Sequence, residues 1–111
     1  MSMNTEVKNG ITICRIGGEI DINTAPDIKK SFDVLTNKKA PKIIINFSKV
    51  TYVDSSGLAT LVEILKNMRQ YGGKLKLTNL PPKIKSLFEI TKFEKLFEIL
   101  AEEESAVESF A

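Results

Sequence analysis

Residues 42–58, KIIINFSKVTYVDSSGL, join a short apolar run to the beginning of an amphipathic segment. The run over 42–47 is β-branched and almost continuously apolar, which is typical of a central strand covered on both faces. From Ser55 onward, apolar residues recur with a helical period at positions 58, 61, 62, 65 and 68. The stretch therefore predicts a buried strand, a loop over 48–54 whose Val50, Tyr52 and Val53 return to the core, and a helix that Gly72-Gly73 ends.

The segments before this stretch predict a hairpin followed by a helix. Residues 6–8 and 11–16 flank the turn Asn9-Gly10, and Gly17-Gly18 is expected to end the second strand. The following helix has Asn23 or Thr24 as its candidate cap and a first-turn proline at position 26. Its apolar positions are 25, 28, 32 and 35, and residues 37–41 end it.

The segments after it continue the alternation of strands and helices. Residues 74–78 alternate and predict a strand with one solvated face. Pro81-Pro82 opens a short helix with apolar residues at 84, 87 and 88 and a further candidate at 90, and an apolar cluster over 93–100 offers a last short strand. The final segment, 102–110, predicts a helix with four glutamates and no basic residue, interpreted as a solvated helix face or a soft tail.

This order of elements predicts an α/β fold in one domain that covers residues 1–111. Strands that alternate with helices form a mixed, mostly parallel central sheet, here with about four to five strands and about four helices. A chain of 111 residues is also too short for two ordinary cores. Its 42% hydrophobic and 27% charged residues are close to the averages of globular domains, which excludes a disordered chain or a coiled coil.

Charge and residue usage exclude several classes of function. Sixteen basic minus fourteen acidic residues give a net charge of +2, too small for a strong nucleic-acid binder. The absence of His and the single Cys14 exclude histidine-based catalysis, disulfides within the chain and Cys/His zinc sites, and no carboxylate cluster has the spacing of a metal-binding loop. Without a secretory signal or an apolar run of membrane-spanning length, we expect a cytoplasmic protein with no membrane insertion.

The junction at 53–58 contains the candidate functional residues. Asp54 and Ser55 precede a predicted helix, where either side chain serves ordinarily as a cap for free backbone N–H groups. The same position exposes a hydroxyl that, if phosphorylated, would hold its charge beside those donors. Gly57 would leave room for another surface to approach.

Other kinds of chemistry at this junction are less well supported. A nucleophilic Ser55 would need a base, and with no histidine that base would be a lysine such as Lys49 or Lys66. A phosphate-binding loop would need more glycines and a following lysine. A second candidate segment, 18–25, contains Asp21, which either forms a local Asx turn or approaches Glu19, although the segment is too irregular to claim an acid–base pair.

Three stretches together resemble the STAS domain of bacterial anti-sigma-factor antagonists. They are Gly18-Glu19-Ile20-Asp21 with Thr24-Ala25, Asn46-Phe47 with Val53-Asp54-Ser55-Ser56-Gly57-Leu58, and Pro82 with Leu87-Phe88-Glu89-Ile90-Thr91. They follow the family's order and spacing over about residues 6–100. One departure is Lys92-Phe93, where the family often has Gly-Leu.

The resemblance implies a regulatory protein that is not an enzyme and has no cofactor. Such proteins bind an anti-sigma serine kinase when unphosphorylated and thereby release the sigma factor. Phosphorylation breaks the complex, and a PP2C-type phosphatase restores it. By the resemblance, Ser55 is the phosphoacceptor. The residues implied in partner binding are Asp21, Asn23, Asp54, Ser56, Gly57 and Leu58.

Two alternatives stay open at this point. The first is a constitutive STAS interaction subunit of a larger signalling or transporter assembly, in which Ser55 is only a cap. The second is a small enzyme or nucleotide-binding domain, which would show affinity for nucleotide in the isolated chain. Sequence alone also does not separate Ser55 from Ser56 as the phosphoacceptor.

Overall fold

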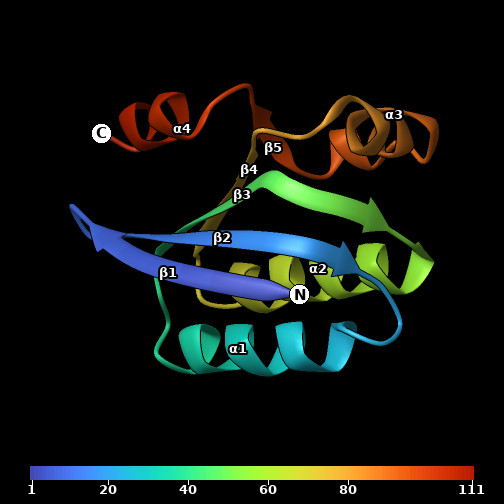
Figure 1. Cartoon of the computed structure of the whole chain (residues 1–111). Helices are drawn as coiled ribbons and strands as arrows, with labels where there is room; N and C mark the ends of the chain where they lie inside the picture. Colours follow the sequence, from blue (N-terminus) through green and yellow to red (C-terminus); the bar gives the residue numbers. More distant parts are fainter.

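The computed structural model describes all 111 residues and contains a five-stranded sheet in the order β1-β2-β3-β4-β5 (Figure 1). The first two strands are antiparallel and the remaining pairs are parallel, so the predicted mixed, mostly parallel sheet is confirmed. The strands are β1 (Ser2–Lys8), β2 (Ile11–Ile20), β3 (Lys42–Val53), β4 (Lys74–Thr78) and β5 (Glu98–Leu100). The helices are α1 (Ala25–Asn37), α2 (Ser55–Arg69), α3 (Pro82–Ile90), the short 3-10 helix η1 (Phe93–Lys95) and α4 (Glu103–Ser109).

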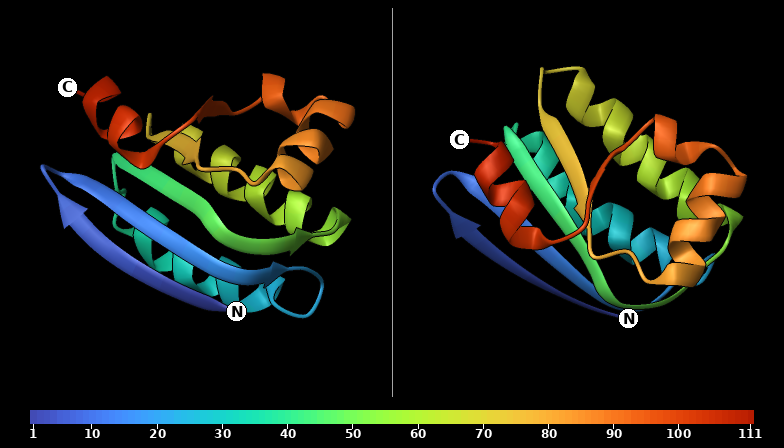
Figure 2. Two further views of the ribbon diagram at one scale, coloured as in Figure 1. Left: turned by 45° about the horizontal axis from the view of Figure 1, so that its top comes forward. Right: turned by 90° about the horizontal axis from the view of Figure 1, so that it is seen from above.

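Helices cover both faces of the sheet. α1 and α2 lie side by side on one face, and α4 lies across the opposite face (Figures 1 and 2). In β3, Ile43 and Ile45 belong to the core beneath α1 and α2, whereas Ile44 packs with Ala106 of α4. The apolar run of β3 is therefore buried on both faces, as its composition predicts.

The helix α2 follows the predicted apolar period. Leu58, Leu61, Leu65 and Met68 are all buried in the main core. In α1, the buried residues are Ile28 and Phe32, again one helical turn apart. None of the helices is both long and apolar enough to cross a membrane.

Three strands are longer than the sequence predicts, since β1 already begins at Ser2 and not at residue 6. Residues 48–53 were expected to form a loop, and Gly17-Gly18 were expected to end β2. Instead, Gly17 to Ile20 pair in parallel with Lys49 to Val53, with two register shifts in this region. Those irregularities disturb the alternation that identifies a strand, which explains why the pattern here is typical of a loop. Tyr52 was also expected to return to the core, but it is 52% exposed.

The expected solvated face of β4 is absent. Its residues from Leu75 to Thr78 are all buried, including Lys76, because α4 packs over this side of the sheet. The Lys76 ammonium pairs with Glu98 at 3.2 Å, donates to the Ser109 hydroxyl and lies 4.0 Å from the ring centroid of Phe110. A lysine in an alternating strand ordinarily indicates a solvent-exposed face. Here that face is buried by α4, a helix that lies far away in the sequence.

The acidic final segment is a docked helix and not a soft tail. Arg15 donates to Glu103 from Nε at 2.9 Å and from Nη2 at 2.8 Å, and Asn46 donates to the same carboxylate at 2.9 Å. The remaining glutamates of this segment, at positions 102, 104 and 108, are exposed. Position 90 was a candidate for the core, but Ile90 at the end of α3 is 79% exposed.

Candidate functional site

Two strand–helix loops meet at the end of the sheet where β2 and β3 terminate. Ile20 at the end of β2 is in register with Val53 at the end of β3. Because these strands are parallel, the loops that follow them leave the sheet side by side, at the edge where α/β folds usually place their sites. The backbone N–H of Asp54 donates to the Ile20 carbonyl at 3.2 Å. The segments predicted to hold functional residues, 18–25 and 53–58, are therefore neighbours.

Asp54 holds the two loops together. Its Oδ1 accepts from the backbone N–H of Gly57 at 2.8 Å, which caps the N-terminus of α2. Its Oδ2 accepts from the backbone N–H of Ile22, in the loop after β2, at 3.1 Å. Both carboxylate oxygens are thus used within the domain, and Asp54 fixes the position of one loop relative to the other.

Ser55 is the first residue of α2, and its side chain is free. The residue is exposed, and its hydroxyl takes no part in the side-chain hydrogen bonds of the structure. Because Asp54 performs the capping, the hydroxyl of Ser55 is not needed to complete the helix. The neighbouring Ser56 is half-buried, and its carbonyl accepts from the Thr60 hydroxyl at 3.0 Å.

Gly57 lies against the strand β2 and not against open solvent. A Cβ atom at this position would lie 2.1 Å from the Ile20 carbonyl oxygen. The surface that approaches Gly57 closely is therefore the chain's own backbone. Leu58 is also buried, at 5% exposure. These two residues shape the site from the interior, whereas Ser55 reaches solvent.

Asp21 organises the loop between β2 and α1. Its Oδ1 accepts from the backbone N–H groups of Asn23 at 2.9 Å and Thr24 at 3.0 Å, so it forms the Asx turn considered from the sequence. The Thr24 hydroxyl accepts from the Asp21 N–H at 3.0 Å and donates to the Glu19 carbonyl at 2.8 Å. Asp21 is buried, whereas Asn23 is exposed.

Glu19 and Asp21 interact, and their pKa values shift in opposite directions. A hydrogen bond with Glu19 and the backbone donors of Thr24 and Asn23 lower the pKa of Asp21. The hydrogen bond with Asp21, and the negative charge of that residue, raise the pKa of Glu19. Asp21 therefore keeps the negative charge, because it has the backbone donors.

The family model of the STAS domain matches residues 2–106. The chain belongs to the STAS domain family. The anti-sigma-B factor antagonist of Bacillus subtilis is 35% identical over 97% of this chain and 100% of its own length, and that of Listeria monocytogenes is 37% identical over 76% and 74%. A Thermotoga maritima protein of known crystal structure superposes with a TM-score of 0.91 at 27% identity, covering 96% of this chain and 92% of its own.

This STAS domain is thus homologous to anti-sigma factor antagonists, as the three motifs predict. Antagonists of this family are regulators and not enzymes, as the resemblance implies. The six residues predicted to bind a partner lie around Ser55 on the two adjoining loops or at the start of α2. Their role in binding is not tested by the fold and stays a prediction.

Two apolar side chains beside these loops were missed from the sequence. Ile22 is 68% exposed, and Tyr52 is 52% exposed near the end of β3. The signal for Ile22 was present in the sequence, since an isoleucine between Asp21 and Asn23 lies within a polar turn. Nothing in the sequence distinguishes Tyr52 in this way, because it lies between Val50 and Val53, two apolar residues that are both buried.

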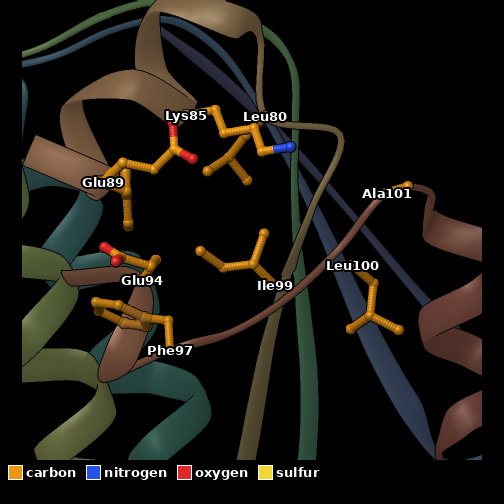
Figure 3. A pocket seen from close by; sticks show the side chains of 9 residues that line it. Leu80, Lys85, Glu89, Glu94, Phe97, Ile99, Leu100 and Ala101 are labelled. Carbon is orange, nitrogen blue, oxygen red and sulfur yellow. The ribbon is translucent and has the colours of Figure 1, made fainter. Parts of the chain in front are cut away.

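One cavity of the STAS domain lies away from these loops. It has a volume of about 590 Å³ and lies between α3, η1 and β5, lined mainly by Leu80, Phe88, Phe97, Ile99 and Leu100 (Figure 3). None of the residues around Ser55 contributes to it. The structure also contains no group of three or more His, Cys, Asp and Glu side chains placed to hold a metal ion.

Proposed function

We propose that this STAS domain is an anti-sigma factor antagonist whose binding to an anti-sigma serine kinase is switched off by phosphorylation of Ser55. The single observation that carries the proposal is the division of roles between Asp54 and Ser55. Asp54 caps α2 and clamps the neighbouring loop, whereas the Ser55 hydroxyl is exposed and makes no hydrogen bond. A kinase can therefore modify Ser55 without first breaking a contact that stabilises the fold.

The domain is suited to tolerate a phosphate at this position. Ser55 and Ser56 begin α2, where backbone N–H groups have no partner within the helix. A phosphate carries a charge of about −1.5 to −2 at neutral pH, and a helix N-terminus favours such a charge. We therefore expect the phosphorylated domain to keep its fold.

The complex would not tolerate the phosphate equally well. Asp54 adjoins Ser55, and Asp21 keeps its negative charge on the adjacent loop. A kinase site already holds the phosphates of its nucleotide, so docking would bring like charges together and remove water from them. An unfavourable change of ~4 kcal/mol would lower the affinity by about three decades.

No large change of shape is required. Asp54 connects α2 to the loop after β2, and Gly57 packs directly on β2, so the two loops are held in place before and after modification. The switch is then a change of surface charge. A PP2C-type phosphatase would reverse it, and the proteins involved would meet in the cytoplasm.

Intact-mass measurement and a binding assay test this proposal together. The full chain is incubated with a cognate anti-sigma kinase and ATP, and the gain of one phosphoryl group is mapped by fragmentation. We expect the modification at Ser55, no modification of Ser55→Ala, and normal modification of the control Ser56→Ala. Ser55→Ala should still bind the kinase, whereas Ser55→Asp should bind weakly.

Two results would count against the proposal. Equal incorporation of phosphate into Ser55→Ala and the unchanged chain would show that the site is wrong. Equal affinity of the phosphorylated and unphosphorylated chains for the kinase would show that the charge does not control docking. Recovery of a transport ATPase, with no kinase or sigma factor, would favour the alternative of a constitutive interaction subunit.

A further inference from the structure

The edge strand β1 is unusually open to pairing. It forms one edge of the sheet, contains no proline, and pairs with β2 from Ser2 opposite Gly17 to Lys8 opposite Ile11 without a register shift. All of its residues except Met3 are exposed. Proteins generally protect such edges with bulges, prolines, charged side chains or a covering segment; of these β1 has only the charges of Glu6 and Lys8, and an uncovered strand is a template for another strand.

The hairpin turn determines which backbone groups face outward. Asn9 and Gly10 have φ angles of 55° and 77°, as in a two-residue type I′ turn. Such a turn is closed by a hydrogen-bonded pair, here Lys8 and Ile11, and bonded pairs then alternate along the ladder. It follows that Met3, Thr5 and Val7 direct their N–H and C=O groups toward the open edge.

We propose that β1 pairs with β1 of a second copy of this chain. The two strands run antiparallel about a two-fold axis that passes between Thr5 of one copy and Thr5 of the other. Their sheets then join into one continuous sheet that crosses the dimer. The contact is isologous, so the same surface of both copies is covered and the assembly is closed.

The sequence of β1 is complementary to itself in this register. Thr5 is the middle residue of the strand, so centring the pair there engages all seven residues. Met3 then lies opposite Val7 of the second copy, and Asn4 lies opposite Glu6 of the second copy. No like charges face each other. Centring the pair on Glu6 would place two carboxylates opposite one another, which destabilises a strand pair.

The exposed apolar residue of β1, Val7, supports this occupant. Val7 is 70% exposed, although it is the only strongly apolar residue in the second half of the strand. Pairing would cover it with Met3 of the second copy, on the face where Met3 already packs against the core. Because only one strand pair is involved, the buried area is small and the dimer is expected to be weak.

The dimer leaves the proposed phosphoacceptors free. β2 lies between β1 and β3, and Ser55 follows β3, so Ser55 does not lie at the paired edge. Each dimer would therefore present two exposed copies of the Ser55 loop. The inference does not depend on the proposed switch, since it rests on β1 alone.

Charged substitutions at Thr5 test the two-fold axis directly. Sedimentation velocity of the full chain is measured over about 10 µM to 1 mM, a range suited to small interfaces. The unchanged chain should form dimers as the concentration rises. Thr5→Lys and Thr5→Glu should each dimerise about tenfold more weakly, because like charges then meet at the axis. An equimolar mixture of the two variants should recover dimers.

A matched variant separates pairing through β1 from a general effect of added charge. Asn37→Lys adds the same charge at an exposed position on α1 and should dimerise as the unchanged chain does. Circular dichroism verifies that each variant is folded. A chain that stays monomeric over the whole range overturns the proposal. So does a mixture of Thr5→Lys and Thr5→Glu that pairs no better than either variant alone.

Discussion

Arg15 on β2 and Glu103 on α4 are joined by two parallel hydrogen bonds of 2.9 and 2.8 Å, although 88 residues separate them. Asn46 on β3 donates to the same carboxylate at 2.9 Å. The Glu103 carboxylate therefore connects α4 to β2 and β3 at once. Paired charges with planar two-point geometry are stronger than a single surface ion pair.

Glu103→Gln should weaken the docking of α4. The glutamine keeps an acceptor for Asn46 but loses the charge that pairs with Arg15. We expect the free energy of unfolding to fall by about 1–2 kcal/mol, measured by urea denaturation. Glu104→Gln makes the same change at an exposed position of α4 and should alter stability by less than about 0.5 kcal/mol. Equal effects of the two variants would contradict the role of Glu103.

The same contact should make stability depend on acid. Hydrogen bonding from Arg15 lowers the pKa of Glu103 below its ordinary value. A carboxyl group with a lowered pKa contributes stability above its unfolded pKa and loses it as the pH falls through its folded pKa. The difference in stability between the unchanged chain and Glu103→Gln should therefore be full near pH 7 and shrink below about pH 4. A difference that grows with acid would show that the sign is wrong.

Gly57→Ala should strongly destabilise the domain. A Cβ atom would lie 2.1 Å from the Ile20 carbonyl oxygen, and this neighbour is backbone that cannot turn aside. The start of α2 must then move away from β2. We expect a loss of about 2–3 kcal/mol in the free energy of unfolding by chemical denaturation. Ser56→Ala, on the same helical turn, is the control and should cost less than about 1 kcal/mol.

The parts of the fold that could be predicted from sequence are those fixed by local pattern. The strand over 42–47 is marked by a nearly continuous apolar run and the helix from Ser55 by a period that persists over its length, and both elements are confirmed. The end of β3 was missed because its pairing with β2 contains register shifts, which break the alternation. The burial of Lys76 was missed because it depends on α4, which lies far along the chain.

The candidate site was also predicted only in part: its residues were identified, but the contact that separates their roles was not. The strand–helix junction identified Asp54 and Ser55 as candidates, because capping residues and free donors belong to helix starts. Their separate roles depend on the loop after β2, whose Ile22 N–H takes the second oxygen of Asp54. That contact joins residues 32 positions apart, and no local pattern indicates it.

Asp54 should contribute to stability through both of its oxygens. Asp54→Ala removes the acceptor for Gly57 and leaves the Ile22 N–H without its partner. A lost helix cap alone costs about 1 kcal/mol, and we expect a total of about 2 kcal/mol by urea denaturation. Asp54→Asn keeps one carbonyl acceptor for the cap and should lose about half as much. If Asp54→Asn lost no stability at all, the contact to Ile22 would carry no weight; if both variants lost the same amount, the cap would carry none.

Phosphorylation of Ser55 should alter binding without altering the fold. The hydroxyl is exposed and unbonded, so its modification breaks no internal contact. The helix N-terminus favours the added charge, whereas neighbouring Asp54 opposes it, and these two effects partly cancel. We expect the free energy of unfolding of the phosphorylated chain to differ by less than about 1 kcal/mol, measured by denaturation of the two forms prepared side by side. A loss of several kcal/mol would mean that the phosphate acts by unfolding the loop, and the charge-only switch would then be wrong.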